Sequence, residues 1–197
     1  MTGRAENIRV MCPLFQVDEG GSTPTSALQL RFVKTDRDTF VKFNKMWHSR
    51  LPKIGGSQGR AFYLATFDDV AYAVAMWSNP VARLLPQLAW IELRRLAICD
   101  DAPKNTASRF IGWMTRDIKV RFPEVERLIS YQDCEVHDGT IYKASGWVHA
   151  DGYKYGKKRD WEESSGGRRR GNRTDQAVAV RMRWEKQLIS HMEERNG

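Results

Sequence analysis

Hydrophobic and polar positions divide the first part of the chain into short, separate elements. Leu28-Gln-Leu-Arg-Phe-Val33 alternates apolar and polar residues, a pattern that predicts a first strand. Thr35 follows this segment and is a predicted helix cap. Phe40, Phe43 and Trp47 then recur at spacings of three and four residues. This spacing predicts a helix with one aromatic face.

The middle of the chain predicts three strands followed by a helix. Residues 61–67 and 70–77 are apolar segments on either side of Asp68-Asp69, a pair that favours a hairpin turn. Residues 90–98 form the next strand. A helix is predicted from Asn105 or Thr106 to about residue 121, because its apolar residues share one face and Pro123 stops it.

The last part of the chain predicts a buried strand over residues 127–131, a short helix around Tyr142 and a terminal strand over residues 178–184. Strands and helices therefore follow the order β-α-β-β-β-α-β-α-β. Residues 1–26 have little periodicity and are expected to form a flexible N-terminal arm. Residues 27–197 are expected to form one domain, since a chain of 197 residues is large enough for one core.

Composition narrows the class of protein. Hydrophobic residues make up 41% of the chain, which excludes disorder for its bulk. Every apolar stretch is far shorter than the roughly 20 residues of a membrane span, and the N-terminus has no apolar signal segment. A cytoplasmic protein without a membrane partner is the simplest interpretation. Cys12, Cys99 and Cys134 have no paired spacing, which argues against a disulfide framework.

Positive charge is concentrated in one segment. The net charge is +8, and residues 153–174 form a predicted basic loop that contains Ser164-Ser-Gly-Gly167 and interleaved aromatic residues. We expect this loop to bind the phosphate backbone of double-stranded DNA; a surface loop that only aids solubility is the alternative. The predicted DNA-binding residues are Lys157, Lys158, Arg159, Arg168, Arg169, Arg170 and Arg173.

Charged residues interrupt the strand predicted over residues 90–98. Regular alternation places Glu92 and Arg94 on one face, and Leu93 and Arg95 on the other. Charges in a central strand are costly unless they are paired or line a pocket. The segment is therefore a candidate site, with an internal Glu–Arg pair that holds the sheet as the alternative.

Gly139-Thr-Ile-Tyr-Lys-Ala-Ser-Gly-Trp147 resembles the final helix of GCN5-related acyltransferases, the GNAT fold. Together with Trp90–Ile98, Ser130-Tyr-Gln-Asp133 and Met46–Pro52, it is similar to the phage Mom DNA-modification proteins, a divergent GNAT branch. The resemblance covers roughly residues 35–184. It implies an α+β fold, with a GNAT-like mixed central sheet of about six to seven strands and helices on both faces.

The resemblance to Mom proteins implies an enzyme of transferase type. Members of that family convert the N6 amine of adenine in phage DNA to a carbamoylmethyl (acetamido) form, which protects the DNA from host restriction. In the GNAT fold the tyrosine of the final helix faces the sulfur of the acyl carrier. The candidate catalytic residues are Tyr142, Glu92, Arg94, Arg95, Ser130 and Asp133.

The resemblance also raises the question of a cofactor. GNAT enzymes hold the pyrophosphate of acetyl-CoA with a glycine-rich loop before the central helix, whereas here that loop lacks glycine and contains Asp100-Asp101. This departure argues against conventional acetyl-CoA binding. The candidate phosphate ligands that remain are Lys104, Asn105, Thr106, Ser108 and Arg109. In the alternative interpretation, Asn105 and Thr106 serve as simple helix caps.

A metal is a second cofactor candidate. The Mom product has a methylene joined to nitrogen, which requires chemistry beyond simple acyl transfer. His48, Asp133 and His137 supply the two histidines and one carboxylate of non-haem Fe(II) sites. In the alternative, His48 caps the C-terminus of a helix and His137 is a surface residue.

Three functions remain open at this stage. The first is adenine modification of Mom type, in which a flipped base would stack on Tyr63, Tyr131 or Trp77. The second is a GNAT acetyltransferase that acts on a small-molecule amine or a protein lysine. The third is a DNA-binding accessory protein on an inactive GNAT scaffold. The sequence leaves the oligomeric state open, with a homodimer as one option.

Overall fold

The structure of the protein is a computed structural model, which describes residues 23–48, 52, 54, 59–150 and 181–188. Residues 1–22 of the predicted N-terminal arm and the whole of the basic loop lie outside these residues. Those two predictions therefore concern parts of the chain that the structure does not describe. The fold below is that of the described residues.

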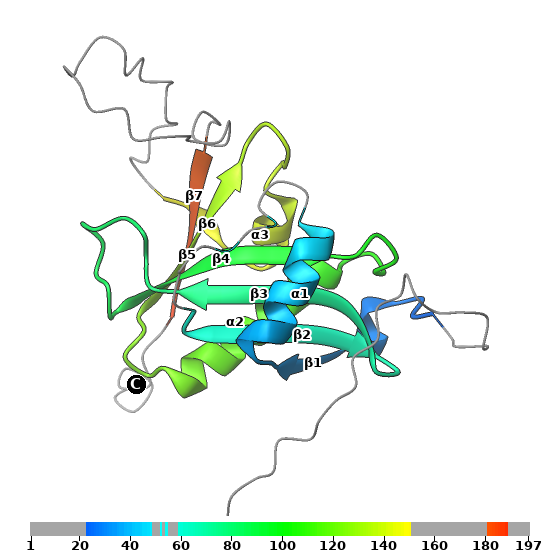
Figure 1. The fold of residues 1–197 in the computed structure, drawn as a ribbon. Coiled ribbons are helices and arrows are strands. Elements are labelled where there is room, and N and C mark those ends of the chain that lie inside the picture. Colours follow the sequence, from blue (N-terminus) through cyan, green and yellow to red (C-terminus); the bar gives the residue numbers. More distant parts are fainter. Residues whose placement is uncertain (1–22, 49–51, 53, 55–58, 151–180, 189–197) are drawn as a thin grey trace, which may run out of the picture.

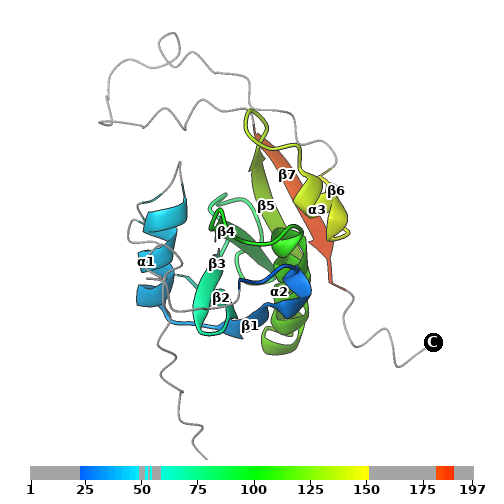
Figure 2. The same ribbon diagram turned by 90° about the vertical axis from the view of Figure 1, so that its right-hand side faces the viewer.

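A seven-stranded sheet with the order β1-β2-β3-β4-β5-β7-β6 forms the centre of the structure (Figure 1). Among the described strands, only β4 and β5 pair in parallel; the other neighbours are antiparallel. Helix α1 covers one face, and α2 and α3 lie on the other (Figure 2). The predicted mixed sheet with helices on both faces is confirmed. The elements are β1 (Arg31–Lys34), α1 (Arg37–Trp47), β2 (Ala61–Phe67), β3 (Val70–Ser78), β4 (Trp90–Ile98), α2 (Thr106–Arg121), β5 (Arg127–Asp133), α3 (Thr140–Ala144), β6 (Val148–His149) and β7 (Arg181–Gln187).

The start of the fold differs from the prediction at two places. A 3-10 helix, Ala27–Gln29, replaces the beginning of the predicted first strand, because Ser26 and Gln29 form a reciprocal capping box. Asp36, rather than Thr35, caps α1: its carboxylate accepts a hydrogen bond from the Thr39 amide at 2.7 Å. The predicted strand therefore begins later, at β1.

The hairpin between β2 and β3 turns where the sequence predicts. Asp68 and Asp69 have φ angles of 46° and 60°, which is the left-handed backbone of a two-residue hairpin loop. Aspartate tolerates this conformation better than most residues do. The turn fixes the register in which Tyr63 pairs with Ala75 and Leu64 with Val74.

Apolar side chains from both layers of helices fill the two faces of the sheet. Phe40 and Phe43 of α1 pack in a cluster with Leu64 and Met76. A larger cluster joins the buried face of α2 to Tyr63, Trp77, Ile91, Leu93 and Tyr142. Cys99 is a buried core residue, and burial raises the pKa of its thiol to about 11. No helix in the described part of the chain combines the length and apolar character needed to cross a membrane.

The last strand runs further than the sequence pattern indicates. Residues 181–187 form β7, whereas the apolar alternation predicts an end at residue 184. Pairing explains the extension, because β7 stays hydrogen-bonded to the whole of β5, from Asp133–Arg181 to Arg127–Gln187. The two-residue strand β6 adds to the outer edge of β7.

Candidate active site

The candidate site lies where the two parallel strands at the centre of the sheet separate. β4 and β5 pair from Trp90–Arg127 to Leu93–Ser130, and no later pair joins them in the described structure. Beyond this point β5 pairs only with β7. Backbone groups at the end of a pairing are available to side chains and ligands. Ser130 and Leu93 therefore mark the apex of an opening in the sheet.

Ser130 and Tyr142 join their hydroxyl groups at this apex. The Ser130 Oγ lies 2.9 Å from the Tyr142 hydroxyl and 3.2 Å from the carbonyl oxygen of Leu93. Both side chains are buried. Burial raises the pKa of the Tyr142 phenol, so this residue stays protonated at neutral pH and can donate a hydrogen bond or a proton. The structure thus brings together two of the predicted catalytic residues.

Aromatic side chains that the sequence analysis left without a role surround Tyr142. Trp184 stacks on the Tyr142 ring with centroids 5.4 Å apart, and Trp147 packs against it at 5.6 Å. The Trp184 indole N–H donates to Gln132 Oε1 at 2.7 Å, and the Gln132 amide donates to the carbonyl oxygen of His137. These contacts fix the position of the Tyr142 ring. The alternation of β5 could have indicated Gln132, which shares a face with Ser130.

Replacing Gly139 with alanine should destabilise the protein by about 2 kcal/mol or more. Gly139 precedes α3 with a φ of +72°, and an added Cβ would collide with Trp184 and Gln132. Urea unfolding of Gly139→Ala and the parent measures the difference. Gly112→Ala in α2 is the control; its nearest neighbour lies 4.0 Å away, and the helix should gain about 0.5–1 kcal/mol. Equal stability of the Gly139→Ala variant and the parent would show that the turn adjusts freely.

A β-bulge in β4 changes the faces on which its charged residues lie. Leu93 pairs with Trp77 and Arg95 pairs with the adjacent Met76, so Arg94 is an additional residue in β4. Met76 belongs to the core cluster under α1, which places Arg95 on the α1 face with Glu92. The prediction that Arg95 shares a face with Leu93 is wrong, because regular alternation cannot anticipate a bulge.

Glu92 is buried and held by two partners. Its carboxylate accepts a hydrogen bond from the Val81 amide at 2.9 Å and lies 3.5 Å from the Arg94 guanidinium. Burial raises the pKa of Glu92 despite these contacts. The Glu–Arg pair that the sequence suggested is present within β4. The hydrogen bond from Val81 ties the start of the β3–β4 loop to this strand.

Arg95, His48 and His137 form a group near the end of α1. Arg95 donates to the Arg94 carbonyl oxygen at 2.7 Å, and burial together with the Arg94 charge lowers its pKa to about 10. His48 is the C-cap residue of α1. Burial, with smaller effects of the Arg95 and His137 charges, lowers the pKa of His48 to about 4. His48 is therefore a neutral imidazole and a weak base at pH 7.

The free energy of unfolding should depend on pH because His48 is neutral in the folded protein. Between pH 6.5 and about 4, the unfolded chain binds a proton at His48 and the folded chain does not. The free energy of unfolding should therefore fall as pH drops through this window. A His48→Gln variant should show a weaker decline in urea unfolding at pH 7 and pH 5. Identical declines, or an NMR titration of His48 near pH 6.5, would contradict the burial argument.

The structure does not assemble the predicted iron ligands into one site. Among the described residues, no three histidine, cysteine, aspartate or glutamate side chains lie close enough together to hold a metal ion. His48 and His137 are near enough for their charges to interact. Asp133 instead takes part in the turn after β5, where its Oδ1 accepts a hydrogen bond from the Glu135 amide at 3.1 Å.

The predicted phosphate ligands at the start of α2 are partly occupied by local hydrogen bonds. The Thr106 hydroxyl donates to the Pro103 carbonyl oxygen at 2.6 Å, and the Ser108 hydroxyl donates to the Asn105 carbonyl oxygen at 3.1 Å. Asn105 is the N-cap residue in a left-handed conformation, but its side chain makes no capping bond. Lys104 and Asn105 are exposed. The residues present do not reproduce a pyrophosphate cradle for acetyl-CoA.

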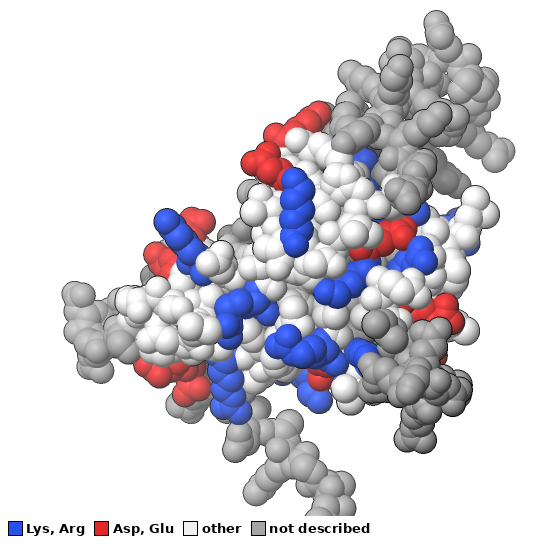
Figure 3. Space-filling model, turned by 180° about the vertical axis from the view of Figure 1, so that it is seen from behind, with Lys and Arg blue, Asp and Glu red and all other residues white. Residues whose placement is uncertain are grey.

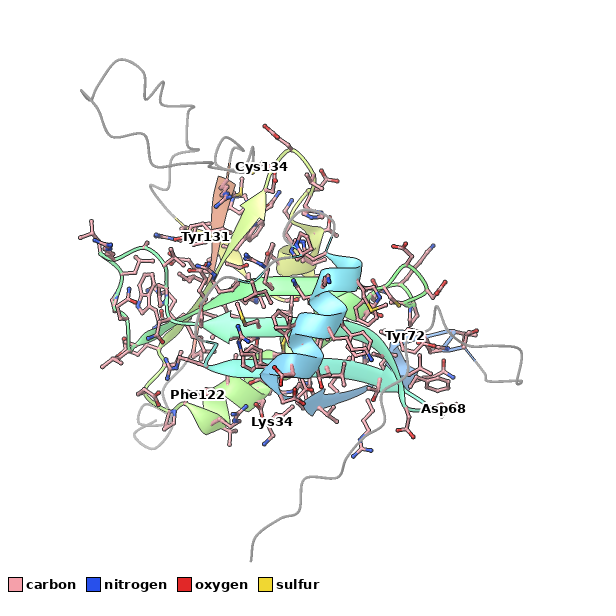
Figure 4. The ribbon with its side chains drawn as sticks, viewed as in Figure 1. Lys34, Asp68, Tyr72, Phe122, Tyr131 and Cys134 are labelled. Atoms are coloured by element: carbon pink, nitrogen blue, oxygen red, sulfur yellow. The ribbon has the colours of Figure 1, made fainter. Side chains whose placement is uncertain are left out.

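Two of the three aromatic residues proposed for base stacking belong to the core. Tyr63 and Trp77 are fully buried, and the Tyr63 hydroxyl bonds to Asp117 at 2.7 Å. Tyr131 is partly exposed on β5, near Cys134 and outside the part of the sheet that α1 covers (Figure 4). Tyr131 is thus the remaining candidate. The predicted DNA-binding residues of the basic loop lie outside the described residues.

Comparison with solved structures shows the same fold in bacterial acetyltransferases. A Bacillus subtilis acetyltransferase in complex with CoA is 12% identical, with a TM-score of 0.54 over 81% of this chain and 99% of that chain. A GNAT family acetyltransferase from Elizabethkingia anophelis with acetyl-CoA bound is 11% identical, with the same TM-score and coverage. A Salmonella typhimurium protein described as an acetyltransferase, with its cofactor acetyl-CoA, is 9% identical, with a TM-score of 0.56 over 83% and 96%.

Sequence comparison gives a more specific result than the fold. No curated protein matches the chain. The model of the Mom protein family matches residues 69–196, which is more than half of the chain and includes Glu92, Ser130 and Tyr142. This protein, a GNAT-like fold whose sheet opens beside a buried Ser–Tyr pair, belongs to the Mom protein family.

Proposed function

We propose that this protein is a DNA-modifying enzyme that converts the N6 amine of adenine to a carbamoylmethyl form and so protects phage DNA from host restriction. The match to the Mom family over residues 69–196 carries this proposal. The matched segment contains the strands, the bulge and the short helix that build the candidate site. The new bond joins the adenine nitrogen to a methylene carbon, and the amine loses one proton.

The two faces of the opening support a division of roles between the reactants. Ser130 and Tyr142 lie on the α3 side, whereas Glu92, Arg95 and His48 lie on the α1 side. An adenine amine on the α1 side would have the neutral imidazole of His48 as a proton acceptor. The protonated Tyr142 hydroxyl would face the group that leaves the methylene carbon. Hydrogen bonding or proton transfer there would favour departure of that group.

The target amine pairs inside the duplex, so the enzyme must extrude the base before it can react. A flipped adenine needs an aromatic or apolar surface on which to stack and polar groups that contact its Watson–Crick edge. Tyr131 offers a partly exposed ring on the same face of β5 as Asp133. The carboxylate of Asp133 would then suit the amino edge of adenine. This arrangement gives Asp133 a role in substrate binding that needs no metal.

Mass spectrometry of nucleosides from the DNA of cells that express the full chain tests the proposal. Digested DNA should contain a deoxyadenosine heavier by one carbamoylmethyl group, which is absent from cells with an empty vector. The likeness to acetyl-CoA-bound acetyltransferases favours one other candidate, acetylation of a small-molecule amine or a protein lysine. Unmodified adenine together with new acetylated amines would replace the proposed function with that one.

A further inference from the structure

A cationic groove lies on the outer side of α2, away from the face on which Glu92 and Arg95 are found. It has a volume of about 620 Å³ and runs between α2, the end of α3 and the end of β7. This volume is within the range of small-molecule sites in proteins. Of the candidate residues for chemistry or phosphate binding, the groove includes Ser108 and Arg109.

The charge of the groove has one sign. Among the residues that the structure describes, Arg109, Arg116, Lys119 and Lys186 line it, and no acidic residue does. The first three recur at spacings of seven and three residues, which places them along one face of α2. The Lys186 ammonium is held at the opposite wall by a hydrogen bond to the Ser145 carbonyl oxygen at 2.6 Å. A concave wall of like charges attracts anions strongly. Lysine and arginine side chains are also prominent on this side of the molecule (Figure 3).

The groove also offers an aromatic surface beside the charges. Trp113 lines it and is held in place by Phe32, at 6.0 Å between centroids, and by the edge of Tyr63, at 5.7 Å. Gly112 adjoins this tryptophan, and a Cβ there would meet its nearest neighbour only at 4.0 Å. The missing side chain leaves room beside the helix. A rigid indole between cations suits a flat heterocycle that carries phosphate groups.

The loop before α2 is a poorer anion site than this groove. The hydroxyl groups of Thr106 and Ser108 already donate hydrogen bonds to backbone carbonyl groups. Asp100 and Asp101 would repel an anion. We propose that the groove on α2 binds a phosphate-bearing nucleotide, with its heterocycle near Trp113 and its phosphates on the four cations. A free nucleotide and the nucleotide end of a carrier such as coenzyme A share this chemistry. The inference does not depend on the proposed DNA modification.

Calorimetric titration of the full chain with ADP and with CoA tests the groove. The double variant Arg116→Ala/Lys119→Ala should weaken binding by about 10- to 100-fold, the loss expected when hydrogen bonds to charged groups are removed. Lys42→Ala/Lys45→Ala, which removes two exposed cations from α1, is the charge-matched control and should bind as the parent does. Tighter binding of CoA than of ADP would identify a carrier; equal affinities would identify a free nucleotide.

A second variant separates shape from charge. Gly112→Phe fills the space beside Trp113 and removes none of the four cations, so it should also weaken nucleotide binding. Melting temperatures without ligand show whether each variant still folds. Absence of binding by the parent, or equal affinity of the parent and both groove variants, overturns the proposal. Loss of affinity for duplex DNA instead of nucleotide in the double variant would also overturn it and assign the groove to DNA.

Discussion

Replacing Tyr142 with phenylalanine should lower the rate of DNA modification by about 10²–10⁴-fold, the usual size of a general acid–base contribution. The change removes one hydroxyl, which lies 2.9 Å from Ser130 at the apex of the opening between β4 and β5. The ring itself stays fixed by Trp184 and Trp147. Fold and DNA affinity should therefore remain near those of the parent while turnover collapses. Single-turnover modification of a DNA fragment measures the effect.

Tyr72→Phe is the matched control for this experiment. Tyr72 is also buried, and it lies on β3 near the turn at Asp68, across the view from Tyr131 (Figure 4). Loss of its hydroxyl should leave the rate within a few-fold of the parent. Similar rates for Tyr142→Phe and Tyr72→Phe would reduce Tyr142 to a packing residue. A large loss in both variants would point to general damage to the fold.

Replacing Arg168, Arg169 and Arg170 with alanine should weaken binding to duplex DNA by about 10²-fold at physiological salt. Each lost phosphate contact removes about 0.9 from the slope of log affinity against log salt concentration, so three contacts remove up to about 2.7. The basic loop lies outside the described residues, and this prediction rests on its composition alone. Titration of a labelled duplex at several salt concentrations measures the slope.

A control must separate specific contacts from net charge. Arg37, Lys42 and Lys45 are exposed on α1, and replacing all three with alanine lowers the net charge by the same amount. The slope should change less in this variant than in the loop variant. Equal changes in the two variants would mean that overall charge, and not the loop, sets affinity. An unchanged slope in the loop variant would assign the loop to solubility.

The sequence predicts the fold wherever the pattern is local. Asp68-Asp69 identifies its own turn, and the start of α2 at Thr106 follows from the spacing of its apolar residues. Boundaries set by a helix cap or by pairing with a distant strand are less visible in the hydrophobic pattern. Ser26 and Gln29 redirect the chain before β1 by a mutual capping box, and β7 is extended by its pairing with β5. The spacing of hydrophobic residues indicates neither of these contacts.

The site is predictable only in part for the same reason. Resemblance to a known family identifies Tyr142 and Ser130, and the structure places their hydroxyls in contact. The partners of Tyr142 come from β5 and β7, so the sequence shows Gln132 and Trp184 as unrelated residues. Burial removes Trp77 from the set of stacking candidates, because its segment packs on both faces of the sheet. The burial of Trp77 and the contact between Gln132 and Trp184 arise only when the core is assembled.

Because Arg94 is the additional residue of the bulge, β4 could lose it and its other side chains would stay on the same faces of the sheet. Arg94 adds one residue opposite a single step of β3. A chain without it would regain regular alternation, and Leu93 would still face α2 while Arg95 still faced α1. Loss of this residue would therefore spare the core and cost Glu92 its ionic partner. An alignment of related sequences should accordingly permit a one-residue gap at Arg94. With that gap allowed, the residue aligned with Arg95 is assigned to the α1 face in every sequence.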